Sequence, residues 1–394
     1  MNNNFNTIQF PKSALIDTEL LSQVFLNITN SYKYFWFKAI IDKTKIYMPP
    51  SFPRISIKEL ILYMIMQSYY MINYCNLNLG YNDQLKEVNK YIYTVYTVNP
   101  IKSINELEDE FTILNISNDA KVSQYLNKLK SYVPVCFLSP YINNCERFNK
   151  QTIKRINDIY KKNLHYFNNT FPYHFGEYKN NPLDTEIIID DYYIDYFKKN
   201  YEFLNAFYKC NLIEFLQKRN PNVPGIINKL CPQLERNDIS DINKFYENVI
   251  DIAGTKINDI YTDEPLENLS NKILSIDHFV PWSYVANDEI WNLTPTSKSI
   301  NSSKSNKLPN KKYISKLINQ KWDVYRLIRD NKELKTYFLS KIREKFIFTE
   351  RIIRLFVFET NMLVSEEVFK NCYEETIQTT YTQCYNSGFT NIFY

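Results

Sequence analysis

The stretch Asp277-His278-Phe279-Val280-Pro281-Trp282-Ser283 places a histidine directly after an acid, and the chain of 394 residues has only three histidines. Two asparagines follow, one in Trp291-Asn292-Leu293 and one at the start of Asn301-Ser302-Ser303-Lys304. An acid, an imidazole and amide side chains within a short segment can together bind a cation and move a proton. The stretch therefore predicts a catalytic centre, and we expect the rest of the chain to support it.

The local pattern predicts a strand, a loop, a second strand and a helix. A mostly apolar run at residues 273–276 ends at Asp277, as a short strand would. Residues 291–294 are expected to form the returning strand. Residues 297–306 are expected to form a helix that the side chain of Ser297 caps. This order of elements is a ββα unit.

In this ββα geometry Asp277 and Asn301 can reach one metal ion, while His278 faces the phosphate to be cleaved. A neutral imidazole can take the proton of an attacking water near pH 7. A divalent cation lowers the cost of the charge that develops on the leaving oxygen. Carboxylate and amide oxygens are hard ligands that suit Mg²⁺ or Mn²⁺ better than zinc. We therefore expect a magnesium or manganese cofactor and no zinc.

The segment around and after the second asparagine is basic. From Ser297 to Trp322 there is no Asp or Glu, but there are seven lysines, at positions 298, 304, 307, 311, 312, 316 and 321. Lysines attract the phosphate backbone without reading its sequence. We therefore expect a nucleic-acid-binding surface that includes Lys298, Lys304, Lys307 and Lys311.

The composition indicates a folded protein with a mildly basic surface. Hydrophobic residues make up 44% and aromatic residues 16% of the chain, and the net charge of +4 is compatible with nucleic acid. The seven cysteines contain no C-x-x-C pair, so neither a zinc ribbon nor a disulfide framework is expected. The start of the chain lacks a signal-peptide pattern, and no segment has the roughly 18 apolar residues of a membrane span. We expect a soluble, cytoplasmic protein.

Outside the catalytic stretch the chain is predicted to be mainly helical. We expect a helical N-terminal domain at residues 1–150, a mixed, mostly helical connection at 151–256, the ββα module at 257–312 and a helical C-terminal region at 313–394. Ser56-Ile57-Lys58-Glu59 and Ser103-Ile104-Asn105-Glu106 have the form of capping boxes. Gly80 is expected to end the first of these helices. Residues 133–138, with prolines near both ends, are expected to be a short strand or an extended connection.

Other polar groups are weaker candidates for a site. His165 and His174 lack acidic or histidine neighbours at helical spacing, so we expect both to be structural. An acidic group is expected to be a solvated face, because no lysine follows it at the spacing of a two-carboxylate nuclease: Glu186, Asp190, Asp191 and Asp195. The chain has no Gly-x-x-x-x-Gly-Lys-Ser/Thr motif, so ATP- or GTP-driven work by a P-loop is not expected.

Lys218 and Arg219 lie at the end of a helix predicted over residues 201–216. A Lys-Arg pair at this position suits a phosphate contact. It equally suits an ordinary helix C-terminus, where cations complement the helix dipole. Both interpretations stay open.

The motif resembles that of the HNH (ββα-metal) endonucleases, which have Asp-His, then Asn-Leu, then Asn-x-x-Lys. The separations of 14 residues (278 to 292) and 23 residues (278 to 301) resemble those in the HNH domain of RNA-guided CRISPR DNA nucleases. This resemblance covers roughly residues 271–309. It implies that His278 is the general base, that Asp277 and Asn301 bind the metal, that Asn292 braces the histidine loop and that Lys304 contacts phosphate.

The whole chain resembles, more loosely, bacterial HNH-domain proteins that have a helical N-terminal region and a segment like residues 215–224. It departs from many HNH proteins in lacking zinc-binding cysteines around the module. We therefore expect packing to hold the module together, with Trp282, Tyr284 and Trp291 as candidates. It also lacks the other parts of the CRISPR nucleases, so binding of a guide RNA is not implied.

The predicted fold is therefore mainly α, with helical N- and C-terminal regions around one ββα-metal (HNH) nuclease module. The resemblance implies a metal-dependent endonuclease that hydrolyses DNA phosphodiester bonds, nicks one strand per site, and acts in bacterial antiviral defence or restriction of foreign DNA. Two alternatives stay open: an RNA-cleaving HNH nuclease, and a DNA-binding subunit of a larger complex with a vestigial nuclease site. DNA is the expected partner and a membrane is not, whereas a homodimer or a larger defence complex is left open.

Overall fold

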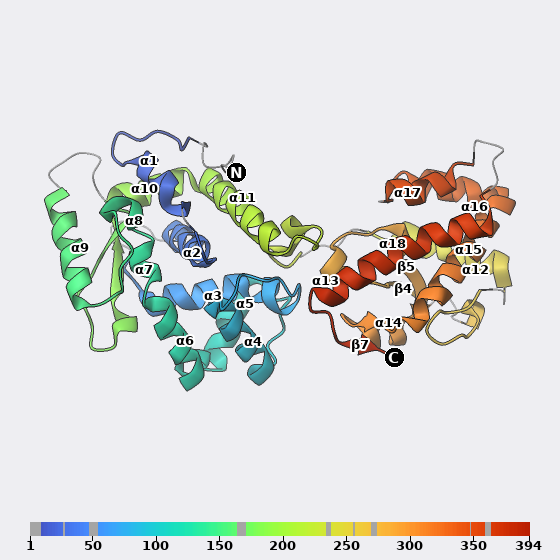
Figure 1. The fold of residues 1–394 in the computed structure, drawn as a ribbon, viewed down its shortest axis with the longest axis horizontal. Helices are drawn as coiled ribbons and strands as arrows, with labels where there is room; N and C mark the ends of the chain where they lie inside the picture. Colours follow the sequence, from blue (N-terminus) through green and yellow to red (C-terminus); the bar gives the residue numbers. More distant parts are fainter. Residues whose placement is uncertain are drawn as a thin grey trace. The chain divides into compact units, whose positions relative to one another are not determined.

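The computed structural model describes residues 9–26, 28–46, 54–163, 171–233, 238–254, 257–268, 274–346, 348–358 and 364–394. Within these ranges the chain is mainly helical with few strands, as predicted (Figure 1). It divides into two compact units, Met1–Pro221 with Leu230–Pro232 and Asn222–Lys229 with Gln233–Tyr394. No helix in the described ranges is both long enough and apolar enough to cross a lipid bilayer.

The first unit contains a three-stranded antiparallel sheet with the order β1-β3-β2. Its strands are β1 (Arg54–Ser56), β2 (Tyr173–Phe175) and β3 (Glu186–Ile189). The central strand β3 carries three consecutive isoleucines at residues 187–189, of which Ile187 and Ile189 are fully buried and Ile188 is partly exposed. Alternation along a strand turns every second side chain to the same face, which explains this burial.

Helices make up most of the first unit. They are α1 (Thr18–Ser22), α2 (Tyr32–Ile46), α3 (Ile57–Asn73), α4 (Gln84–Tyr96), α5 (Ile104–Ile113), α6 (Ala120–Lys130), α7 (Val133–Cys136), α8 (Ser139–Ile142), α9 (Lys150–Asn163), α10 (Asp191–Lys199) and α11 (Tyr201–Arg219). The Ser56 hydroxyl accepts a bond from the Glu59 backbone N–H, and Ser103 with Glu106 forms a complete capping box. Both predicted helix starts are confirmed.

Three predictions for the first unit were wrong. Helix α3 ends at Asn73, so Gly80 does not end it. Residues 133–136 form the short helix α7 rather than a strand, since a proline within the first turn has the fixed φ that a helix start needs. Asp190 is buried and its carboxylate caps α10 through the N–H of Tyr192, so the acidic group is not entirely solvated. The structure also joins Cys136 to Cys145 in a disulfide that the sequence pattern did not indicate.

His174 has a structural environment. Its ring stacks on Tyr160 with the centroids 4.3 Å apart. Burial lowers the pKa of His174 to about 4, because a charged imidazolium loses its hydration there. Its neutral ring at pH 7 agrees with the structural role predicted for it. His165 lies outside the described residues.

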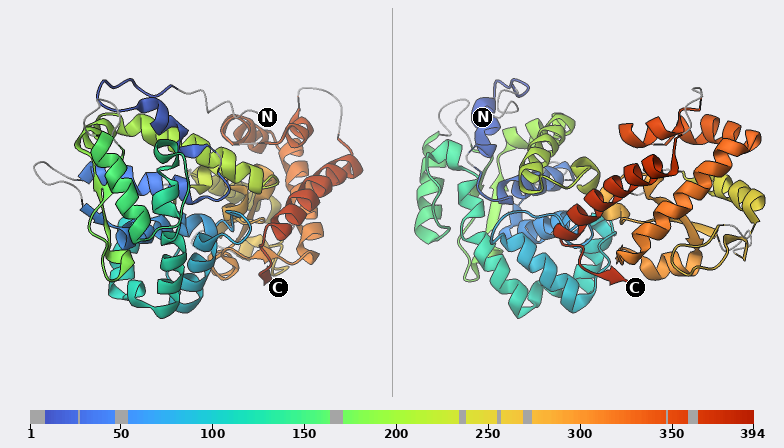
Figure 2. Two further views of the ribbon diagram at one scale, coloured as in Figure 1. Left: turned by 60° about the vertical axis from the view of Figure 1, so that its left-hand side comes forward. Right: turned by 45° about the vertical axis from the view of Figure 1, so that its right-hand side comes forward.

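The second unit surrounds a small ββα core with helices (Figures 1 and 2). Its strands are β4 (Leu274–His278), β5 (Leu293–Ser297), β6 (Leu308–Pro309) and β7 (Ile392–Phe393), and its helices are α12 (Ser240–Ala253), α13 (Trp282–Val285), α14 (Lys298–Lys304), α15 (Lys312–Asp330), α16 (Lys332–Tyr337), α17 (Glu350–Ile353) and α18 (Glu366–Asn386). The long helices α15 and α18 lie side by side. Aromatic rings fill the space between them, including Trp322, Tyr325 and Phe369.

The end of the chain returns to the ββα core. Strand β7 pairs with β6 in parallel, with Leu308 opposite Ile392. The Tyr381 hydroxyl donates to the carbonyl of Pro309 at 2.7 Å, which fixes α18 to the same place. The C-terminal region is mainly helical, as predicted, and its last element is the short strand β7.

Candidate active site

The register of the ββα core places two neighbouring side chains in different surroundings. Strand β4 runs antiparallel to β5, with Asp277 opposite Thr294 and His278 opposite Leu293. Successive side chains of a strand point to opposite faces. The carboxylate of Asp277 accordingly lies inside the unit, 3% exposed, whereas the His278 side chain is 13% exposed at the edge. One residue is thus placed to hold a buried charge and the next to meet a substrate.

Asn292 holds the loop that follows the histidine. Its amide group donates to the carbonyl of Val280 at 2.9 Å and accepts from the N–H of Val280 at 2.7 Å. The N–H of Phe279 donates to the backbone carbonyl of Asn292 at 2.8 Å. Because Asn292 is fully buried, water does not compete for these bonds. A bracing role in catalysis stays a prediction, but the contacts that it needs are present.

Asp288 contacts the histidine directly. Its Oδ1 lies 2.8 Å from Nε2 of His278, and the Asp288 side chain is only 10% exposed. Asp288 follows α13 in the loop that leads to β5, ten residues after the histidine. A carboxylate at this distance orients the imidazole ring and stabilises it when it carries a proton.

The carboxylate of Asp277 has a partner on each oxygen. Oδ1 accepts from Nζ of Lys304 at 2.9 Å, and Oδ2 accepts from the Tyr261 hydroxyl at 2.6 Å. Nζ of Lys304 also donates to the backbone carbonyl of His278 at 2.7 Å. Burial and the negative charge of Asp277 raise the pKa of Tyr261 well above its usual value, so its hydroxyl stays a donor.

Asn301 lies on α14, which begins where it was predicted to. The Ser297 hydroxyl caps the helix by accepting from the N–H of Ile300 at 3.2 Å. Nδ2 of Asn301 donates to Oγ of Ser275 at 2.8 Å and to the carbonyl of Ile276 at 3.1 Å. Both bonds use the amide nitrogen, so Oδ1 of Asn301 keeps its capacity as a ligand.

These residues fit a hard divalent cation by their donor chemistry. Each oxygen of Asp277 has a second lone pair, and the amide oxygen of Asn301 is not used by the bonds that orient its nitrogen. Among the described residues no group of three or more His, Cys, Asp or Glu is placed to hold a metal. A cation would therefore take two protein oxygens and fill its remaining positions with water or substrate, which is typical of Mg²⁺.

Of the four lysines of the module predicted to bind nucleic acid, only some lie at the surface. Lys298 and Lys311 are exposed, and Lys307 is partly exposed, with its ammonium against the carbonyl of Ser303 at 3.3 Å. Lys304 is 1% exposed and neutralises Asp277. This differs from the expected phosphate contact. A carboxylate inside the protein needs a nearby opposite charge, and Lys304 supplies it.

Lys218 and Arg219 belong to the first unit, at the end of α11. Lys218 pairs with Glu214 one turn back at 2.6 Å. The guanidinium of Arg219 donates to the carbonyl of Thr29 at 2.7 Å and lies over the ring of Phe215. Helix α11 extends three residues beyond its predicted end, so both cations stand in its last turn and complement the helix dipole there.

Packing holds the module, as predicted. Trp282, Tyr284 and Trp291 are all buried.

Lys321 of α15 is a buried lysine next to β5. Its ammonium donates to the Tyr246 hydroxyl at 2.8 Å and to the carbonyl of Leu293. Complete burial lowers the pKa of Lys321 to about 7. In the sequence Lys321 is one of the seven lysines of the basic segment, and nothing near it indicates that it is buried.

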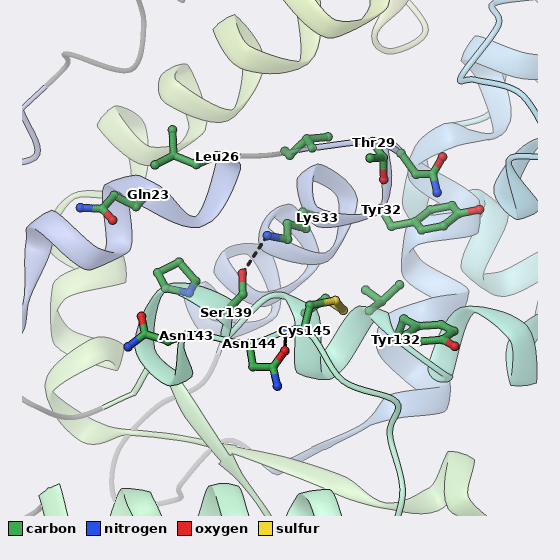
Figure 3. Close-up of a pocket in the computed structure, with 15 residues that line it drawn as sticks. Gln23, Leu26, Thr29, Tyr32, Lys33, Tyr132, Ser139, Asn143, Asn144 and Cys145 are labelled. Carbon is green, nitrogen blue, oxygen red and sulfur yellow. Dashed lines mark hydrogen bonds between the residues drawn. A yellow bond between two sulfur atoms is a disulfide. The ribbon is translucent and has the colours of Figure 1, made fainter.

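A cavity of about 720 Å³ lies in the first unit, and its lining includes Lys33, Tyr32 and Tyr132 (Figure 3). The ammonium of Lys33 donates to Oγ of Ser139 at 3.1 Å. None of the residues predicted for catalysis or metal binding lines it. The candidate active site is therefore a separate feature of the second unit.

Residues 259–310 match the family model of the HNH endonucleases. The matched segment includes β4, β5 and α14, with Asp277, His278 and Asn301. Comparisons with curated proteins and with solved structures gave no significant match. The chain contains an HNH endonuclease domain, built as the ββα unit described above.

Proposed function

We propose that this protein is a metal-dependent endonuclease that hydrolyses DNA phosphodiester bonds. The observation that carries the proposal is the environment of His278. It stands at the partly exposed end of β4 with a carboxylate on its ring, directly after Asp277 in an HNH domain whose helix α14 carries Asn301. Such a group is suited to take a proton from water near neutral pH.

Each residue has a distinct task in this proposal. His278 accepts the proton of the attacking water. Asp277 and Asn301 hold a divalent cation, which when bound would offset the charge on the leaving oxygen. Asn292 keeps the loop after His278 in place through its bonds to Val280. The site is thereby ordered before substrate arrives, which spares the reaction the cost of arranging it.

The proposed substrate is DNA, and the proposed setting is defence against foreign DNA. Lys298 and Lys311 are exposed on the same unit and offer charge for phosphates without base recognition. One such site cuts one strand, so the expected product from supercoiled plasmid is a nicked circle.

The test incubates the purified chain with supercoiled plasmid, linear DNA and RNA, in Mg²⁺, Mn²⁺ or EDTA. The expected result is metal-dependent nicking of DNA. His278→Ala should abolish nicking while DNA binding, measured by fluorescence anisotropy, survives. His174→Gln is the matched control, since it alters another histidine in the other unit and should leave nicking unchanged.

The outcomes separate the parts of the proposal. Full activity in folded His278→Ala would remove His278 as the base. Cleavage of RNA alone would replace the substrate. Equal nicking in EDTA and in Mg²⁺ would contradict the role of the cation. DNA binding without any cleavage by the wild type would favour a binding subunit with a vestigial site.

A further inference from the structure

The loop between α13 and β5 is shaped so that Asp288 turns back towards the end of β4. Ala286 has a φ of 53°, in the left-handed region, and its N–H donates to the carbonyl of Trp282 at 2.7 Å. The carbonyl of Ala286 accepts from Nδ2 of Asn228 at 3.2 Å. A residue without a β-branch tolerates this conformation, but at some cost in energy. The loop is held in this form, and Asp288 is its side chain that reaches His278.

The contact decides which nitrogen of the histidine carries the proton. A neutral imidazole has one N–H donor and one acceptor, whereas an ionised carboxylate only accepts. Oδ1 of Asp288 lies 2.8 Å from Nε2 of His278. The hydrogen must therefore be on Nε2, and the lone pair on Nδ1 is the one left for water.

We infer that Asp288 is a positioning residue that fixes His278 in the Nε2–H form and makes Nδ1 the proton acceptor in the proposed hydrolysis. The inference rests on the proposed function for the use of Nδ1, but the Asp288–His278 pairing does not depend on activity. When Nδ1 takes a proton from water, the ring becomes positive and the attacking hydroxide forms. Asp288 then stabilises the imidazolium through a charge-assisted hydrogen bond and keeps its own negative charge.

If Asp288 had only a structural role, it would not determine which nitrogen of His278 carries the hydrogen. Both side chains are largely buried, 13% exposed for His278 and 10% for Asp288, so water does not easily replace the bond. In Asp288→Asn the amide can present its NH₂ group to Nε2. That group donates, so it favours the form in which Nδ1 carries the hydrogen and has no lone pair to offer.

The direct test is the nitrogen NMR spectrum of the full chain labelled with ¹⁵N-histidine, recorded without metal. The chain has only three histidines, so His278→Gln assigns the signals of His278 by their loss. The expected wild-type spectrum shows a pyrrole-type Nε2 and a pyridine-type Nδ1. Asp288→Asn should shift the population towards Nδ1–H, whereas Asp323→Asn, which alters a partly exposed acid of α15 that pairs with Arg326, should not.

Nicking kinetics provide the second readout. Because a positioned base contributes about 100- to 10,000-fold, Asp288→Asn should lower kcat by roughly 10- to 100-fold and leave KM nearly unchanged. Nδ1–H in the wild type, or a tautomer shift without a fall in kcat, would overturn the inference. So would an Asp288→Asn protein, folded by circular dichroism, that changes neither readout. A wild type that shows Nε2–H but cuts nothing would overturn the proposed function and leave the pairing intact.

Discussion

Among the described residues the first unit buries two charged side chains, Asp83 and Asp190, whereas the second unit buries six: Lys229, Asp259, Asp277, Asp288, Lys304 and Lys321. Both buried acids of the first unit are helix N-caps. Asp83 accepts from backbone N–H groups at the start of α4, and Asp190 does so at the start of α10. Their burial has a local explanation, because a cap satisfies free N–H groups at a helix start.

Two buried acids of the second unit contact basic side chains from other elements. Asp277 meets Lys304 on α14, and Asp288 meets His278 on β4. Taking charges out of water is expensive, and ion pairs inside a protein often add little net stability. Buried charges that no helix cap explains are therefore more informative than buried charge in general, and here three of the six lie at His278: Asp288 on its ring, Asp277 next to it in the chain, and Lys304 on its carbonyl.

The largest expected effect comes from breaking one of these pairs. Lys304→Met leaves Asp277 buried with only the Tyr261 hydroxyl, and should lower the free energy of unfolding by about 3–5 kcal/mol. Adding Asp277→Asn should restore most of that loss, because no buried charge then remains alone. Urea unfolding followed by tryptophan fluorescence measures this, since three of the four tryptophans lie in the second unit. A Lys304→Met protein as stable as the wild type would contradict the importance of the pair.

The second prediction concerns how the free energy of unfolding depends on pH through the buried Lys321. Its pKa falls to about 7 on folding, from a usual value near 10.5, so the unfolded chain binds the proton more tightly. The free energy of unfolding should therefore rise by up to about 1.4 kcal/mol per pH unit from pH 7 to 10, with no such gain below pH 7. Lys321→Met should remove this slope. Urea unfolding at each pH measures it, and an identical slope in the two proteins would show that Lys321 does not cause it.

In the first unit the same kind of change should have a smaller effect. Asp83→Ala removes the N-cap of α4 and should lower stability by about 0.5–2 kcal/mol. Asp83→Asn keeps an oxygen that can cap, so its effect should be smaller still. Thermal melting by circular dichroism measures both. A loss in Asp83→Asn as large as that in Lys304→Met would erase the distinction between the units.

The exposed lysines should have the smallest individual effects. Each phosphate contact contributes about 0.9 to the slope of log affinity against log salt. Lys311→Ala should therefore weaken DNA binding modestly and reduce the slope by about that amount, if Lys311 makes one contact. Fluorescence anisotropy in EDTA over a range of salt measures this. Lys345→Ala, which removes a lysine paired with Asp241, is the control. Equal slopes for Lys311→Ala and the wild type would exclude the contact.

The sequence predicted those parts of the site that depend on a short segment. Asp277, His278 and Asn301 lie within 25 residues, and strand, loop and cap signals there were sufficient to place them. Helix caps at Ser56 and Ser103 were predictable for the same reason. Each of these features depends on residues only a few positions away, so the local sequence is enough to predict it.

Contacts between distant segments were not predictable. Asp288 and Glu289 are adjacent acids in one loop, and only the folded loop shows which of them reaches the histidine. The lysine-rich segment predicts that Lys304 lies at the surface. In the structure Lys304 is buried because it pairs with the carboxylate of Asp277, 27 residues earlier. Tyr261 contributes from the start of the module, 16 residues before Asp277. A single sequence offers no periodic signal for such pairs.

The pairing of β7 with β6 also bears on the order of synthesis. Translation proceeds from the N-terminus, so the segment with Asp277, His278 and Asn301 is made well before residues 392–393. Until those residues leave the ribosome, β6 has no partner, and Tyr261 lacks the ring of Phe393 that lies 5.5 Å from its own. The packing around Tyr261, whose hydroxyl donates to Asp277, is therefore complete only after residues 392–393 have been made.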